Sequence, residues 1–475
     1  MTPPLPTRAS HYTAMANYDT IAAVSTPIGE GGIGIVRISG PEALDTALKL
    51  FTIKGNVAAV EERRMYYGTV FDPREKKTID DGFMVFMKGP RSYTGADVVE
   101  IHCHGGTLVL RKTLEAAIKG GARMAGPGEF TRQAFLNGKL DLAQAEAVID
   151  LIRAQTEVSL QAARGRLDKA FSRRVGEIKE ALLDLLVNLE AELDFPEDEV
   201  EGLMSEAIEQ GLAEAGGRIE RLLATYEEGR AIRDGVRVLI LGRPNVGKSS
   251  LLNILLKQER AIVTPHPGTT RDVIEEVINL RGVPIRLMDT AGLRDTDDHV
   301  ESIGVRLARE RIETAELILL VIDVSSGSFD EDMGILKSIE NKKVIVAANK
   351  IDLVPGRLDV EGAFGGQKVM FISALGSTGI EELKDAIYEE STGRPYGAGL
   401  DAPPGELVAT VRQRDALAKA LEGVWRAGTA LKEGLPREFI ATDLRHSVDR
   451  LGEITGETTT EDILDRIFSG FCIGK

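Results

Sequence analysis

The stretch GRPNVGKSS, residues 242–250, matches the pattern GxxxxGK[ST] and decides the fold of the middle of the chain. It follows the strand-like run VRVLIL and leads into the helical run SSLLNILLK. A glycine-rich turn between a strand and a helix presents backbone amides to a phosphate group at the start of the helix. The sequence therefore predicts a phosphate-binding loop with the contacts Asn245, Val246, Gly247, Lys248, Ser249 and Ser250.

Strand-like and helical runs alternate around this loop, from about residue 236 to 392. Such alternation is typical of a parallel sheet with helices packed on its faces. We therefore expect an α/β domain of the P-loop class over residues 233–392. The strand-like runs are VRVLILG, VPIRLMDTAG, AELILLVIDVS, KKVIVAANK and KVMFISA.

Four further motifs follow the loop in order, and they specify the nucleotide: PGTTRD (267–272), DTAG (289–292), NKID (349–352) and SAL (373–375). The Asp352 carboxylate can accept hydrogen bonds from guanine N1 and N2, a donor pair that adenine lacks. Lys248 would reach the β- and γ-phosphates, while Ser249 and Thr270 would ligate Mg²⁺. We therefore expect GTP with Mg²⁺. The predicted contacts beyond the loop are Thr264, Pro265, His266, Pro267, Gly268, Thr269, Thr270, Asp289, Thr290, Ala291, Gly292, Asn349, Lys350, Ile351, Asp352, Ser373, Ala374 and Leu375.

The rest of the chain shows two other sequence patterns. Residues 20–125 mix strand-like runs, glycine-rich turns and one helical pattern, TLVLRKTLEAAIKGGA, which indicates an α+β domain. Amphipathic helical runs lie on both sides of the α/β domain, so we expect that domain to be inserted into a helical domain whose halves pack together. The predicted parts of this multidomain chain are a disordered 1–18, an α+β domain 19–126, a first helical part 127–232, the α/β domain 233–392 and a second helical part 393–475.

The composition is that of an ordinary globular protein, with 475 residues, 43% hydrophobic and 28% charged. A net charge of −16 argues against coating of nucleic acid through bulk charge, so such contacts need a local basic site. The only cysteines are Cys103 and Cys472, which fits the reducing cytoplasm, and no apolar run is long enough to predict a membrane span. The basic segment 164–174 either contacts nucleic acid or forms a solvated helical face, and the second is favoured.

Four segments outside the nucleotide motifs carry a more specific signal: GIGIVRISG (32–40), SYTGADVVEIHCHGG (92–106), PGEFTRQAFLNGKLDLAQAEAVIDLI (127–152) and FSGFCIGK (468–475). Together they resemble the MnmE family of tRNA modification GTPases, and the resemblance extends from about residue 19 to 475. It implies a homodimer formed by an N-terminal domain that binds a tetrahydrofolate derivative, 5-formyl or 5,10-methylene. The implied folate contacts are Arg37, Glu100, Lys139 and Lys475.

The resemblance also implies a partner and a chemistry. Together with an FAD-binding protein similar to MnmG (GidA), the family adds a (carboxymethyl)aminomethyl-type group to C5 of wobble uridine 34 in certain tRNAs. The one-carbon unit comes from the folate, and FAD is bound only by the partner. Cys472, in the terminal CIGK, would then have a role in tRNA modification. The alternative for Cys472 is a small buried hydrophobic residue at a helix end.

Leu293 stands where many small GTPases have a glutamine that orients the attacking water. The resemblance implies two replacements for that glutamine. A potassium ion would offset developing charge on the phosphates. Glu301 would be the catalytic residue that orients the water, the alternative being a solvated charge at a helix start. The implied potassium ligands are Asn245, Thr264, His266 through its backbone carbonyl, and Thr269.

Two other functions compete with a potassium-activated GTP hydrolase in tRNA modification. A ribosome-assembly switch GTPase of the Era or Der type would share GRPNVGKSS and DTAGL, but it would lack the folate-like N-terminal domain and the CIGK end. A folate-dependent transferase with a merely regulatory GTPase is the third hypothesis. Folate binding by residues 1–125 alone would favour it.

Overall fold

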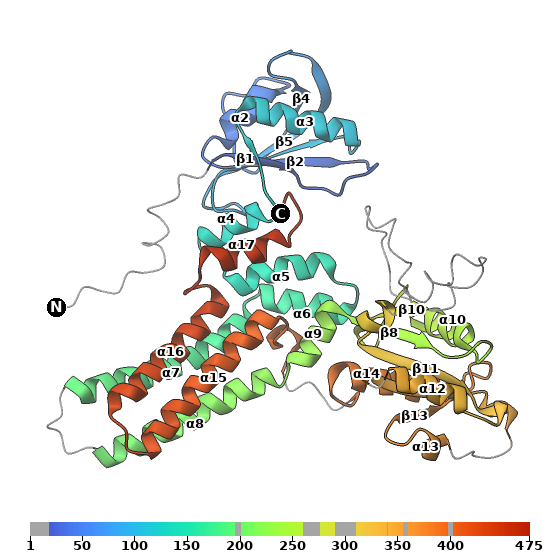
Figure 1. Cartoon of the computed structure of the whole chain (residues 1–475). Helices are drawn as coiled ribbons and strands as arrows, with labels where there is room; N and C mark the ends of the chain where they lie inside the picture. The colour runs from blue at the N-terminus through green and yellow to red at the C-terminus, as the bar shows by residue number, and fades with distance from the viewer. Residues whose placement is uncertain are drawn as a thin grey trace. The chain divides into compact units, whose positions relative to one another are not determined.

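The computed structural model describes residues 19–194, 201–259, 276–289, 310–339, 341–354, 360–397 and 402–475 (Figure 1). The chain forms two compact units. The first comprises the described residues up to Ile149 together with Gly452–Lys475, and the second comprises those of Asp150–Leu451. Within the described ranges, every helix is too short or too polar to cross a bilayer.

The first unit is built on a seven-stranded sheet in the order β3-β4-β5-β6-β2-β1-β7. Neighbouring strands are antiparallel except β1 and β7. Helices α2 (Ala43–Leu50) and α3 (Thr107–Gly120) pack their apolar sides against the sheet, and the α+β prediction is confirmed. The strands are β1 (Ile21–Val24), β2 (Gly34–Ser39), β3 (Phe51–Ile53), β4 (Met65–Phe71), β5 (Thr78–Met87), β6 (Val98–Cys103) and β7 (Arg123–Met124).

Helix α2 was not predicted, because the sequence pattern indicates only one helix within residues 20–125. Its run ALDTALKL has eight residues. Ala43, Ala47 and Leu50 lie on one side of the helix and are fully buried. Two helical turns contain too few positions for a clear period, so the pattern could not reveal the helix.

The end of the chain belongs to the first unit. Helix α17 (Glu461–Ser469) packs on α4 (Glu129–Leu136), and the Arg132 guanidinium lies 2.9 Å from the Asp465 carboxylate. Beyond α17, Ile473 forms an antiparallel bridge with Pro127. The next residue, Gly474, lies against β1, because a Cβ on it would lie 2.1 Å from the Val24 carbonyl oxygen.

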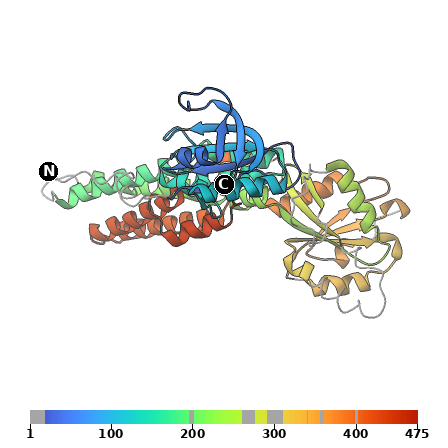
Figure 2. The same ribbon diagram turned by 90° about the horizontal axis from the view of Figure 1, so that it is seen from above.

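The helical part of the second unit combines segments from both sides of the α/β domain. Helix α8 (Glu201–Leu223) lies alongside α15 (Val411–Lys432) and α7 (Ala170–Asp194), as Figures 1 and 2 show. This packing confirms the predicted insertion of the α/β domain. The remaining helices outside that domain are α5 (Leu142–Arg153), α6 (Glu157–Leu167), α9 (Tyr226–Asp234), the short 3-10 helix η4 (Pro404–Glu406) and α16 (Arg437–Thr455).

The basic segment 164–174 is not solvated throughout, so the favoured interpretation was wrong for Arg166. This side chain is 3% exposed, and its guanidinium lies 3.1 Å from the Asp150 carboxylate. The burial follows from close backbone packing, because a Cβ on Gly165 would lie 2.7 Å from the Cα of Gly405. Arg166 is therefore held inside the unit by an ion pair.

The α/β domain contains a six-stranded sheet in the order β13-β12-β11-β8-β10-β9, parallel except for the β9–β10 hairpin. Successive residues of β11 point to opposite faces of the sheet and enter two separate hydrophobic cores. Leu319 belongs to one core and Leu320 to the other. The predicted sheet covered on both faces is confirmed. Its elements are β8 (Val236–Leu241), α10 (Lys248–Glu259), β9 (Glu276–Leu280), β10 (Val283–Asp289), β11 (Leu317–Asp323), η2 (Val324–Ser326), α12 (Asp330–Ser338), β12 (Lys343–Asn349), η3 (Ile351–Leu353), α13 (Val360–Ala363), β13 (Lys368–Phe371) and α14 (Ile380–Thr392).

Candidate functional site

The described parts of the predicted nucleotide motifs lie at one edge of the six-stranded sheet. In the strand register, Asp289 at the end of β10 pairs with Ile240 near the end of β8. Asp323 at the end of β11 pairs with Asn349 at the end of β12. Ligands of parallel α/β sheets bind at the carboxyl ends of the strands, so this edge is where a nucleotide is expected.

The phosphate loop has the backbone of a tight cradle. Gly242 and Gly247 have φ angles of +146° and +103°, and a Cβ on Gly242 would lie 2.2 Å from the Val321 carbonyl oxygen. Asn245 is a non-glycine residue with φ +62°, in the left-handed region. The Lys248 ammonium donates hydrogen bonds to the backbone carbonyls of the loop, at 2.8 Å to Gly242. The cationic group therefore lies across the loop that is predicted to bind phosphate.

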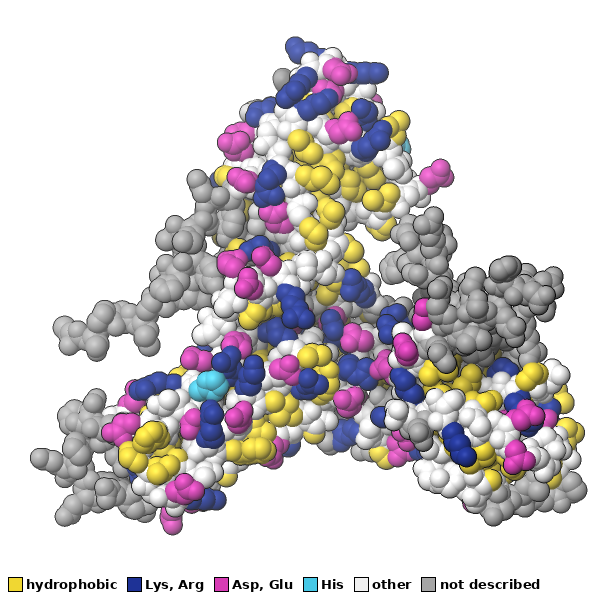
Figure 3. All heavy atoms as spheres, in the orientation of Figure 1, with side chains coloured by type: hydrophobic (Ala, Val, Ile, Leu, Met, Phe, Trp, Pro, Cys, Tyr) yellow, Lys and Arg dark blue, Asp and Glu magenta, His cyan; other side chains and the backbone are white. Residues whose placement is uncertain are grey.

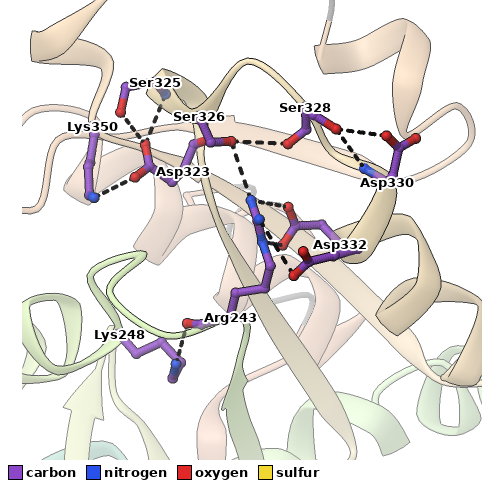
Figure 4. A network of polar contacts seen from close by, with 10 residues as sticks. Arg243, Lys248, Asp323, Ser325, Ser326, Ser328, Asp330, Asp332 and Lys350 are labelled. Carbon is purple, nitrogen blue, oxygen red and sulfur yellow. Dashed lines mark hydrogen bonds and ion pairs between the residues drawn. The ribbon is translucent and has the colours of Figure 1, made fainter.

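Arg243 anchors the phosphate loop to helix α12 (Figure 4). Its Nε donates to the Asp332 carboxylate at 3.0 Å, and a second guanidinium nitrogen lies 2.9 Å from the other carboxylate oxygen. Asp332 is fully buried, and burial raises its pKa although the bond from Arg243 lowers it. The Arg243 guanidinium also donates to the Ser326 hydroxyl at 3.3 Å, so the clamp reaches the segment that follows β11.

The NKID motif is held by hydrogen bonds on both sides. Asn349 is 2% exposed, and its backbone follows the register of β12. The Lys350 ammonium donates to Asp323 (Figure 4). Burial raises the pKa of Asp323, but the bonds from Lys350 and Ser325 outweigh it and keep that pKa below its ordinary value. The Ser373 hydroxyl donates to the Asp352 carboxylate at 2.6 Å, which orients the group predicted to bind guanine.

The remaining predicted nucleotide contacts divide into two groups. Ser249 and Ser250 are exposed at the start of α10, where a helix N-terminus favours anions, and Leu375 is 89% exposed beside the guanine motif. Ile351 donates its amide to Ile372 at 3.3 Å. The other predicted residues lie outside the described ranges: Thr264, Pro265, His266, Pro267, Gly268, Thr269, Thr270, Thr290, Ala291, Gly292 and Glu301.

A second polar cluster lies on the sheet of the first unit. Arg37 on β2 and Glu100 on β6 are register partners, and the Arg37 Nε donates to Glu100 at 2.9 Å. His102, two residues along the same strand, lies 3.4 Å from the other Glu100 oxygen. The bond from His102 and the charge of Arg37 keep the pKa of Glu100 below its ordinary value despite burial. The cluster therefore holds a half-buried, ionised carboxylate.

The C-terminal tail completes this cluster, but Lys139 points elsewhere. The Arg37 guanidinium reaches the Gly474 carbonyl oxygen at 3.5 Å. Burial and the charge of Arg37 lower the pKa of Lys475. Cys472 is exposed, so the alternative that it is a small buried hydrophobic residue is wrong. The Lys139 ammonium instead donates to the Pro90 carbonyl at 3.0 Å, and no contact with Arg37 or Glu100 is found in the described ranges.

Three residues of this cluster were not among the predicted folate contacts. His102 contacts Glu100 as described above, and the rings of Tyr93 and Phe130 lie 5.6 and 5.7 Å from the Arg37 guanidinium carbon. The period-2 spacing of Glu100 and His102 could have revealed their shared face. No local pattern links Phe130 to Arg37, because the two are far apart in sequence.

The fold and the nucleotide site define a P-loop GTPase. Residues 20–139 match the family model of the GTP-binding protein TrmE N-terminus, and residues 142–472 match that of the MnmE helical domain. The chain belongs to the MnmE family of tRNA modification GTPases.

Curated relatives match along nearly the whole chain. The tRNA modification GTPase MnmE of Geobacter metallireducens is 48% identical over 457 residues, covering 96% of this chain and 99% of that protein. The protein of the same name from Alkaliphilus oremlandii is 44% identical with the same coverage. Among solved structures, the G domain of T. maritima FeoB is 32% identical, and the match covers 33% of this chain and 98% of that chain with a TM-score of 0.26.

Proposed function

We propose that this chain is a potassium-activated GTP hydrolase that modifies tRNA together with an FAD-binding partner. The reaction adds a (carboxymethyl)aminomethyl-type group to C5 of wobble uridine 34 in certain tRNAs, with the one-carbon unit supplied by a bound tetrahydrofolate derivative. FAD is bound by the partner, a protein similar to MnmG, and the complex works in the cytoplasm. The support is membership of a family of tRNA modification GTPases and the two polar sites described above.

One observation carries the potassium dependence: the position of Asn245 in the phosphate loop. Its side chain is exposed and makes no hydrogen bond with any residue in the described ranges. Its left-handed backbone lies in the loop that is predicted to bind the phosphates, so its amide oxygen can accept a cation beside a bound nucleotide. A monovalent cation held there supplies positive charge where other GTPases use an arginine, which is worth about 10³–10⁵ in rate.

Hydrolysis in KCl and in NaCl of equal concentration tests this proposal. Asn245→Gly is the sharpest variant, because glycine keeps the left-handed φ of +62° while it removes the side-chain oxygen. Stimulation by KCl that is lost in the variant supports the proposal. Exposed Asn253 on α10 provides the matched control as Asn253→Ala, which should keep the stimulation. Equal wild-type rates in both salts would refute it, and the charge that offsets the phosphates would then come from another residue or from a partner.

The folate site is proposed on the Arg37–Glu100 cluster. A pterin presents a donor edge that an ionised carboxylate can accept in bidentate fashion, and Glu100 is kept ionised by its neighbours. Lys475 and Arg37 supply cations for the glutamate tail. Glu100→Gln should weaken binding of 5-formyl-tetrahydrofolate roughly 10- to 100-fold in calorimetry, which corresponds to one charged hydrogen bond. Glu115→Gln on the exposed face of α3 is the control, and equal losses in both variants would contradict the site.

The proposed homodimer would be formed by the first unit. Figure 3 shows apolar side chains gathered on this unit. Ile28 and Ile33 in the β1–β2 loop are each 67% exposed. Tyr67 and Phe83, a cross-strand pair on β4 and β5, are 47% and 44% exposed. Exposed apolar groups of this kind mark contact surfaces. Sedimentation of the full chain should show a dimer, and a monomer at micromolar concentration would refute it.

A further inference from the structure

A polar cavity of about 400 Å³ lies in the second unit, where helix α9 leads into strand β8. It is distinct from the nucleotide site, because Arg237 is at the amino end of β8 whereas the phosphate loop follows its carboxyl end. The cavity lining includes Arg153, Arg230, Arg233, Arg237 and Arg286 together with three carboxylates. None of these residues belongs to the nucleotide motifs or the folate cluster.

The lining carries an excess of positive charge. Five arginines come from α5, α9, β8 and β10, and they face three carboxylates. Four separate elements therefore bring guanidinium groups to one cavity. In a chain with a net charge of −16, such a concentration is a local exception to the overall acidity. Excess positive charge in a concave site attracts anions by focusing the field.

Each of the three carboxylates contacts an arginine of α9, and Glu316 also accepts a bond of 3.4 Å from the Arg237 backbone amide. Asp150 accepts a bond of 2.7 Å from Arg233 and also pairs with Arg166, which does not line the cavity. Asp234 lies 3.0 Å from Arg233, and Glu316 pairs with Arg230. The carboxylates thus fix the arginines of α9 in place.

Arg237 and Arg286 are register partners on the neighbouring strands β8 and β10. Like charges directly opposite each other across two strands are unfavourable. Gly235 brings the backbone close to this pair, because a Cβ added there would lie 3.6 Å from the Arg286 Nε and 2.7 Å from the Pro284 carbonyl. An anion seated between the two guanidinium groups would offset their repulsion. Guanidinium forks match the oxygens of phosphate in geometry as well as in charge.

We propose that this arginine cavity binds a phosphate group. Two sources share that chemistry: a backbone phosphate of tRNA, and free inorganic phosphate or pyrophosphate. The tRNA source rests on the proposed function, whereas the free anion does not. Because the rest of the chain is acidic, a backbone phosphate held here would position the RNA without reading its sequence.

The test uses the full chain with saturating GDP, so that the phosphate loop is occupied. Arg237→Gln/Arg286→Gln is compared with the control Arg426→Gln/Arg445→Gln, which removes two exposed arginines of α15 and α16. Binding of labelled tRNA is measured over a series of KCl concentrations, and binding of pyrophosphate by calorimetry. Arg237→Gln alone, at an exposed position of β8, serves if the double variant fails to fold.

We expect the cavity variant to bind tRNA roughly tenfold more weakly, with a salt slope smaller by about 1 to 2, while the control keeps the slope. Loss of pyrophosphate binding with unchanged tRNA binding would assign the cavity to a free anion. Unchanged binding of both probes would overturn the proposal. If the wild type binds no tRNA, the proposed function in tRNA modification is contradicted. The pyrophosphate measurement then still shows whether the cavity binds a phosphate group.

Discussion

The Asn349 side-chain amide donates a hydrogen bond of 2.8 Å to the backbone carbonyl oxygen of Val246. The other end of the same side chain accepts a bond of 2.9 Å from the Ala374 amide. One buried asparagine therefore joins the phosphate loop, the NKID motif and the SAL motif. The two ends of a bound guanine nucleotide would rest on a single hydrogen-bonded unit.

Replacement of Asn349 by alanine should weaken GTP and GDP binding together. Loss of the side chain leaves the buried Val246 carbonyl and Ala374 amide without their partner, at a cost of about 1–3 kcal/mol, or roughly 10- to 100-fold in affinity. Calorimetry with GDP measures the loss. Asn137→Ala is a matched control, because Asn137 also donates to a backbone carbonyl, that of Thr94, but in the first unit. Unchanged affinity in Asn349→Ala would show that the loop holds its shape alone.

The clamp between Arg243 and Asp332 gives a prediction with two variants. Arg243→Met leaves a carboxylate in a fully buried position, so we expect lower stability of the α/β domain and weaker GDP binding. The double variant Arg243→Met/Asp332→Leu removes that uncompensated charge and should recover most of the stability. Thermal unfolding with and without GDP measures both effects. A double variant less stable than the single one would contradict the clamp.

The long strands and helices could be predicted because each contains enough residues to show a clear apolar pattern. The run LILLVID of β11 is apolar at every position but the last, as a strand covered on both faces requires. The hairpin strand β9 was not predicted. Its five residues, EVINL, follow charged positions, and no helical run separates them from the next strand. Short elements such as α2 and β9 depend on what packs against them rather than on their own pattern.

The nucleotide site was more predictable than its internal supports. GRPNVGKSS and NKID are continuous motifs, so residues such as Lys248 and Asp352 can be named without coordinates. The bond from Asn349 to Val246 depends on the order of strands β12, β11 and β8, which no local pattern contains. The same holds for the bond between Arg37 and Gly474, whose positions differ by 437 residues.

Gly474 offers a way to disturb the proposed folate site without changing a residue of the nucleotide motifs. Its φ is +97°, and a Cβ there would lie 2.1 Å from the Val24 carbonyl oxygen, so Gly474→Ala must displace the tail. Strain of about 1–3 kcal/mol predicts roughly tenfold weaker binding of 5-formyl-tetrahydrofolate. Gly138→Ala has a similar positive φ of +67° but open space around it. We expect calorimetry to separate the two variants while GDP affinity stays equal. Similar folate affinity in both would show that the tail does not contribute.

The stability of the first unit should depend on pH through the ionisation of Asp72. A bond from Lys119, then backbone bonds from Glu75 and Arg74, lower the pKa of Asp72 to about 2 from 3.8. Because the folded pKa is below the unfolded one, this stabilisation is complete above the unfolded value and is lost as pH falls through the folded value. Asp72→Asn should therefore melt at a lower temperature than the wild type near neutral pH, and the gap should narrow between about pH 4 and pH 2. Calorimetric melting of the full chain over that range measures it, with Asp45→Asn as a control of equal charge at an exposed position. A gap that stays constant down to pH about 2 would show that the ion pair with Lys119 is not its origin.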